Sequence, residues 1–138
     1  MAHEQRIHPM LAYEDGYVAI DWLVKTFGFV EKTRMEDKGR ISHAELELDG
    51  SSIMLATPAP GYQSPKRHRE HCEAARKWSD TPYIINGIVL EVDDIGAHYE
   101  RAKGAGATIL SPLEDSGLGF WRYRAEDLEG QRWMFTGK

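Results

Sequence analysis

The chain repeats one residue pattern at a spacing of 80 positions. Residues 49–56 place an acidic residue, a turn glycine, two polar residues and an apolar trio with a central methionine in that order. Residues 129–136 repeat this order. The openings of the two halves also agree, because residues 9–15 and 88–94 each run from an apolar stretch into an acidic helix start. Two copies of one unit usually pack together, and the seam between them is a natural place for a pocket.

Each half reads as a strand, a helix and three further strands. In the first half, apolar residues recur at helical spacing between Asp15 and Gly28, and residues 41–48 alternate between apolar and polar. In the second half, a strand over 87–92 precedes a helix over 93–103. The pattern predicts an α+β fold made of two tandem βαβββ modules.

The last strands of the second half are less regular in sequence. Thr108 begins a strand that we expect Ser111 and Pro112 to interrupt. A third strand is predicted over 119–125, and the final strand over 131–136.

A single domain is the expectation for 138 residues. Module one is assigned to residues 5–57, the connector to 58–85 and module two to 86–138. In the connector, Ser64 and Pro65 form a good helix start, which predicts a polar helix over 65–78. Two interpretations of this segment stay open: a surface connector, or a lid over a pocket with Tyr62 or Trp78 as its apolar contact.

The composition narrows the class of partner. A formal net charge of −5 argues against nucleic acid, which normally meets a basic face. No apolar run approaches the roughly 20 residues that span a bilayer, and residues 1–6 lack the apolar core of a signal peptide. One cysteine, Cys72, excludes an internal disulfide. We therefore expect a cytoplasmic protein with a small-molecule partner, and neither a nucleic-acid nor a membrane partner.

The duplicated module resembles the vicinal oxygen chelate superfamily, which includes glyoxalase I, the bleomycin resistance proteins and the extradiol dioxygenases. The resemblance rests on residues 90–94, on the helix ending at 101–107 and on the turn and strand at 127–135, where Leu128 stands in place of the more usual proline. It covers nearly the whole chain apart from the connector. It implies a curved, half-barrel mixed sheet and a homodimer.

The resemblance also implies that one face of each sheet packs on helices while the other lines a ligand cavity. Strand alternation then sorts the side chains, with Ile53, Leu55, Trp133 and Phe135 among the packing set. Trp121 and Tyr123 are expected to pack as well. The residues assigned to the ligand cavity are His8, Met10, Met54, Glu91, Phe120, Arg122, Arg124 and Met134.

Enzymes of this superfamily hold one divalent metal at four cavity positions, two in each module. Carried over one position at a time, these positions fall on His8, Met54, Gly87 and Met134. A thioether is a poor ligand for zinc, iron(II) or manganese, and glycine offers no side chain. The sequence therefore predicts no metal and no cofactor.

Several other motifs carry weaker signals. His68 and His71 share one helical face, where a solvated surface is favoured over a metal pair. Glu91 could form an ion pair with Arg122 or Arg132, or bind a ligand amine.

Two functions from different classes follow. The first is a metal-independent small-molecule binding protein, with its ligand in the cavity between the sheet modules and Arg122 or Arg124 orienting a carboxylate or phosphate. The alternative is an enzyme: a metal-dependent lyase or dioxygenase with displaced ligands, or a metal-independent catalyst with Glu91 or His8 as its base. Displaced ligands could come from His43, Glu45 and Glu47 if the register of their strand differs from the one assumed. A third interpretation is a cavity filled by the protein's own side chains, with dimerisation as the main surface property.

Overall fold

The computed structural model describes residues 5–81 and 86–138. The elements follow one another as β1 (Met10–Ala12), α1 (Gly16–Phe27), β2 (Val30–Asp37), β3 (Arg40–Leu48), β4 (Ser51–Ala56), α2 (Pro65–His71), α3 (Glu73–Ser79), β5 (Gly87–Glu91), α4 (Ile95–Gly104), β6 (Thr108–Asp115), β7 (Trp121–Glu126) and β8 (Arg132–Gly137).

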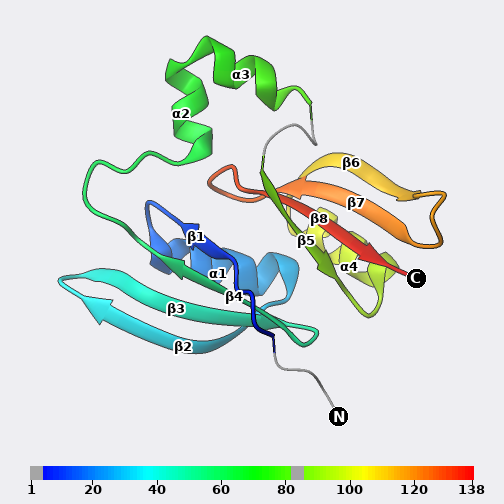
Figure 1. Ribbon diagram of the computed structural model, residues 1–138, viewed down its shortest axis with the longest axis horizontal. Helices are drawn as coiled ribbons and strands as arrows, with labels where there is room; N and C mark the ends of the chain where they lie inside the picture. Colours follow the sequence, from blue (N-terminus) through cyan, green and yellow to red (C-terminus); the bar gives the residue numbers. More distant parts are fainter. Residues whose placement is uncertain (1–4, 82–85) are drawn as a thin grey trace.

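Each half of the chain forms its own four-stranded mixed sheet (Figure 1). The strand orders are β1-β4-β3-β2 and β5-β8-β7-β6, so the two sheets have the same topology. In each sheet the first and last strands of the module pair in parallel and the remaining pairs are antiparallel. The predicted α+β fold of two βαβββ modules with open sheets is confirmed.

The long helices begin and end where the sequence supplies caps. The Asp15 carboxylate accepts hydrogen bonds from the backbone of Tyr17 and Val18 at 3.1 and 3.2 Å, and Gly28 ends α1 with a φ of 85°. Asp94 caps α4 in the same way by accepting from the Ala97 backbone at 3.0 Å. These side chains satisfy backbone N–H groups that have no partner within the helix.

One continuous core joins the two modules. The Phe27 ring at the end of α1 lies 5.5 Å from Trp133 and 4.8 Å from Phe135, measured between ring centroids, and both of these belong to β8. All three side chains are almost fully buried. Burial of a large aromatic side chain stabilises a fold by about 1.5–3 kcal/mol, so this contact is a substantial link between the modules.

The connector forms two short helices where the sequence predicted one. Cys72 takes an extended conformation, with φ −127° and ψ 111°, and separates α2 from α3. Ser64 caps α2 as expected, since its hydroxyl accepts a hydrogen bond from the Arg67 backbone at 3.2 Å. In Figure 1 the pair of helices lies beyond the ends of the sheets, beside the turn between β7 and β8.

Two other predictions in module two were wrong. Pro112 does not interrupt β6, which runs through it with irregular register. This is possible because β6 is an edge strand, where the missing N–H of proline costs no interstrand hydrogen bond. Trp121 does not pack in the core: it is 44% exposed, because it lies at the end of the sheet opposite Gly137.

Within residues 5–81 and 86–138, none of the helices has the length and apolar character that crossing a membrane requires.

Candidate functional site

The outer face of each sheet, meaning the face opposite its long helix, carries most of the side chains that the sequence assigned to a cavity. Met54 and Met134 are half-buried on the outer faces, while their strand neighbours Ile53 and Phe135 are buried in the core. The two methionines hold equivalent places in the two modules, since Met54 pairs with Met10 on β1 and Met134 pairs with Val89 on β5. The alternation of β4 and β8 is therefore the one predicted.

The outer faces leave large apolar side chains in contact with solvent. Met10 is 63% exposed and Val89 is 64% exposed. Both lie on the short parallel strand that begins a module. Exposed apolar residues that are grouped on one surface often mark a binding face.

The charged residues assigned to the cavity lie on the second sheet. Arg122 pairs with Glu114 on β6, with 3.3 Å between Nε and Oε1. Arg124 donates to the Ser111 hydroxyl at 3.3 Å and lies 3.9 Å from Glu114. Glu91 is exposed on β5. Glu91 was suggested as a partner of Arg122 or Arg132, but both arginines pair with other carboxylates. Arg122 binds Glu114, and Arg132 binds Glu126.

The remaining two residues lie apart from these groups. His8 precedes β1, and its Nε2 lies 3.0 Å from the backbone oxygen of Gln5. Its Nδ1 is buried without a hydrogen-bond partner in the described part of the chain. Phe120 is half-buried just before β7 and lines a pocket together with Trp121. The structure thus divides the eight residues between the two modules.

The four positions implied for a metal do not fit one. Met54 and Met134 present thioethers, so His8, with its Nδ1, is one nitrogen donor among the four positions. At Gly87, an added Cβ would lie 3.0 Å from the backbone oxygen of Arg132, so a ligating side chain would require the paired strand to shift. The described residues contain no group of three or more His, Cys, Asp or Glu side chains placed to hold a metal ion.

His43, Glu45 and Glu47 lie on the outer face of β3, in the register that the alternation predicted. Ala44, Leu46 and Leu48 between and beyond them are buried, and Glu45 pairs with Met54. They lie on the same face as Met54, but the described residues around them form no group of three or more His, Cys, Asp or Glu side chains placed to hold a metal ion.

The connector is fixed to module two by an ion cluster of Arg69, Glu126 and Arg132, in which Glu126 and Arg132 are buried and Arg69 is half-buried. The Glu126 carboxylate accepts from the Arg69 guanidinium through two bonds of 2.5 and 2.8 Å and from Nε of Arg132 at 3.0 Å. Arg132 also donates to the backbone oxygens of Ser79 and Thr81 at 2.8 and 3.3 Å. The side chains of Glu126 and Arg132 are only 5% and 4% exposed. Such multiple, charge-assisted bonds hold the end of α3 in place.

Sequence reasoning missed this cluster. The turn before the last strand places Glu126 opposite Arg132, so that pair could have been read from the predicted hairpin. Arg69 could not, because it lies 57 positions away from Glu126 in a segment with no strand register.

A pocket lies between the connector and the starts of β5 and β8, with a volume of about 480 Å³. We call it the connector pocket. The Tyr62 hydroxyl and the Gln131 amide both donate to the backbone oxygen of Ala12, at 3.3 and 3.1 Å, and this fixes one wall. Tyr62 and Trp78, the two residues proposed as lid contacts, both line it. Its full lining is Tyr62, Gln63, Pro65, His68, Arg69, Ala75, Trp78, Ser79, Asn86, Gly130 and Gln131.

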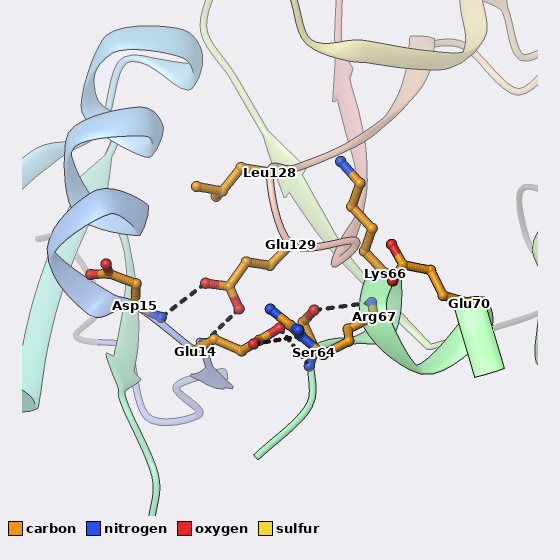
Figure 2. Close-up of a pocket in the computed structure, with 8 residues that line it drawn as sticks. All are labelled: Glu14, Asp15, Ser64, Lys66, Arg67, Glu70, Leu128 and Glu129. Carbon is orange, nitrogen blue, oxygen red and sulfur yellow. Dashed lines mark hydrogen bonds and ion pairs between the residues drawn. The ribbon is translucent and has the colours of Figure 1, made fainter. Parts of the chain in front are cut away.

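A second, charged pocket of about 330 Å³ lies beside the first, between α1, α2 and the turn after β7 (Figure 2). The Glu129 carboxylate accepts from the backbone N–H groups of Glu14 and Asp15 at 2.6 and 3.1 Å. The Glu14 carboxylate in turn accepts from the Ser64 backbone at 3.1 Å and from Arg67 at 2.8 Å. Figure 2 shows these carboxylates turned toward the chain segments that they join.

The two carboxylates have opposite pKa shifts. Burial raises the pKa of Glu129, and the negative charges of Glu14 and Asp127 add to this effect. Hydrogen bonds from Ser64 and from the Arg67 guanidinium lower the pKa of Glu14. Divergent pKa values often mark an acid–base pair, but here the oxygens of both carboxylates accept hydrogen bonds from the protein. We therefore interpret the pair as a structural clamp on the connector.

Residues 6–135 match the model of the Glyoxalase/Bleomycin resistance protein/Dioxygenase superfamily. The chain belongs to this superfamily.

The chain is 34% identical over 117 residues to uncharacterized proteins of Mycobacterium bovis and Mycobacterium tuberculosis. These matches cover 81% of the chain, 69% of the M. bovis protein and 62% of the M. tuberculosis protein. Among solved structures, TioX from Micromonospora sp. ML1 superposes with a TM-score of 0.71 at 32% identity, over 97% of this chain and 96% of TioX.

Proposed function

We propose that this protein binds a small molecule without a metal, and that the ligand lies against the outer faces, in a cavity between the sheet modules. The observation that carries this proposal is the chemistry of the outer faces. The resemblance to the superfamily implies that Met54 and Met134 stand at two of the positions where metal-dependent members carry ligands, and Gly87 at a third. The strand contact at Gly87 leaves no space there for a longer side chain without a shift of β8.

The apolar side chains favour a flat or amphipathic ligand. Met10, Met54 and Met134 carry flexible, polarisable thioethers, which adapt to ligands of irregular shape. Met10 and Met54 are register partners on neighbouring strands, so their side chains form one surface. Val89 extends the corresponding surface of module two beside Met134.

The polar end of the ligand is assigned to the arginines of β7. Arg122 and Arg124 lie on the same face as Met134, and Arg124 is its register partner. A guanidinium group binds carboxylate or phosphate oxygens with two parallel hydrogen bonds. Either arginine would therefore orient an anionic group while the methionines contact the apolar part.

The proposed cavity is completed by a homodimer. In a single chain Met10 and Val89 are mostly exposed, and the predicted residues are divided between two open sheets. A second copy packed on these faces would remove this apolar surface from water, which is favourable at about 25 cal/mol per Å². Sedimentation of the purified protein tests this expectation.

A neutral flat probe tests the proposal. Protein dialysed against a chelator is titrated with N-phenyl-1-naphthylamine, and binding is followed by the fluorescence of the probe. We expect Met134→Glu to weaken binding at least about tenfold, because it places a charge in the apolar surface. Val18→Glu is the matched control, since Val18 is 51% exposed but lies on α1.

Two outcomes would contradict the proposal. One is a stoichiometric transition metal that stays with the protein through dialysis. The other is equal binding of the probe by the Met134→Glu and Val18→Glu variants.

A further inference from the structure

We propose that the connector pocket is a second binding site, which takes a planar aromatic anion such as an aromatic carboxylate. This site is separate from the outer faces, because none of the eight residues assigned to the cavity lines it. Its volume of about 480 Å³ falls within the range of small-molecule sites in proteins.

The walls of the pocket suit a flat ring. Trp78 lines the pocket and is 55% exposed, so its indole is available to a ligand. Tyr62 faces the same space and is held by the bond from its hydroxyl to Ala12. Pro65 and Ala75 add apolar surface. Aromatic side chains stack on planar ligands with a gain beyond simple burial.

The charge of the pocket selects an anion. His68 and Arg69 line it, and no carboxylate is among the described residues of its lining. Glu70, the acidic neighbour of Arg69 in the sequence, lines the adjacent charged pocket instead. The pocket therefore has a basic lining in a chain whose formal net charge is −5.

The positive charge is also fixed in position. Arg69 is held by two bonds to Glu126, and Glu126 is shared with Arg132, so two guanidinium groups face one carboxylate. The Arg69 side chain remains 23% exposed while that of Glu126 is 5% exposed. The pocket thus meets the cation of the pair, and a ligand does not have to order it.

Two ligands of matched shape, one anionic and one neutral, test whether the connector pocket prefers an anion. The protein is titrated by calorimetry with 2-naphthoate and with 2-naphthalenemethanol, which is its neutral counterpart. We expect the naphthoate binding that depends on Trp78 to be about tenfold tighter than the binding of the alcohol. Equal affinity for the two compounds would overturn the assignment of an anion site.

Substitutions locate the site. Trp78→Ala should weaken naphthoate binding about tenfold, and Trp78→Phe, which keeps a flat ring, should retain most of it. Trp121→Ala is the control, because this exposed tryptophan lies on β7, outside the connector pocket. Urea midpoints of all variants show whether the connector stays folded.

The Met134→Glu variant separates this inference from the proposed function. We expect it to keep the naphthoate binding that depends on Trp78, since Met134 does not line the connector pocket. If Met134→Glu abolishes naphthoate binding while Trp78→Ala has no effect, the anion binds at the outer face and the second site is refuted. If probe binding at the outer face fails but naphthoate binding follows Trp78, only the proposed function is lost.

Discussion

His98 on α4 is hydrogen-bonded to the last residue of α1, with 2.8 Å between its Nε2 and the backbone oxygen of Phe27. Its Nδ1 lies 2.6 Å from the hydroxyl of Tyr123 on β7. A carbonyl oxygen can only accept, so Nε2 carries the proton and Nδ1 accepts from the hydroxyl. The neutral imidazole therefore connects module one to module two through one ring.

This arrangement makes stability depend on pH. Burial lowers the pKa of His98 below its ordinary value of 6.5, although the bond to Phe27 opposes this shift. Between the ordinary value and the lower folded one, the unfolded chain binds a proton that the folded chain does not. The stabilisation that neutral His98 gives the folded chain is therefore complete above pH 6.5. It is lost as the pH falls from 6.5 through the lower pKa of the folded state.

Urea unfolding at about pH 7.5 and about pH 5 measures the effect. We expect His98→Gln to be less stable than the parent at the higher pH and to lose less stability on acidification. His71→Gln, at an exposed histidine of α2, should behave like the parent at both values. A parent and a His98→Gln variant with identical pH dependence would contradict the assignment.

Removal of the Glu126 charge should strongly destabilise the protein. Glu126→Gln leaves Arg69 and Arg132 without their shared anion, and Arg132 is almost fully buried. Breaking a buried pair on one side costs about 3–5 kcal/mol, so the urea midpoint should fall markedly. Limited proteolysis should then cut the connector, whereas Glu73→Gln, in an exposed pair with Lys77, should change neither property.

Gly130 is predicted to be irreplaceable for connector docking. Its φ of 92° is unfavourable for other residues, and an added Cβ would lie 2.6 Å from the backbone nitrogen of Lys66 on α2. Gly117 has a similar φ of 79° but open space around it. Gly117→Ala should therefore cost only the conformational penalty of about 1–2 kcal/mol, and Gly130→Ala clearly more. Equal unfolding free energies for the two variants would show that the contact with α2 is unimportant.

The Tyr13 hydroxyl donates to the buried carboxylate of Asp127 at 2.6 Å, which joins the segment after β1 to the turn after β7. Trp133 donates to the same oxygen at 3.1 Å, so Asp127 keeps one side-chain donor when Tyr13 is changed. We expect Tyr13→Phe to lower the unfolding free energy by about 2 kcal/mol, as for a hydrogen bond to a charged group. An unfolding curve that matches that of the parent would contradict this expectation.

The sequence correctly predicted those helices and strands that are marked by residues within or next to them, such as caps and alternating apolar positions. The helix starts at Asp15 and Asp94 follow from side chains that reach backbone groups within three residues. The faces of β4 and β8 follow from alternation, which fixes the direction of Met54 and Met134 once the strand is known. Repetition of the module then predicted that both sheets have one topology.

Caps, turns and alternation act over a few residues, so residue patterns were enough to predict the two βαβββ modules and the outward direction of Met54 and Met134. Tertiary structure alone decided that β6 continues through Pro112, that Cys72 divides the connector, and that Arg69 meets Glu126. Two of these depend on where distant segments lie: an open sheet edge tolerates proline, and a buried carboxylate holds an arginine 57 positions away. The connector pocket exists only because of such long-range contacts.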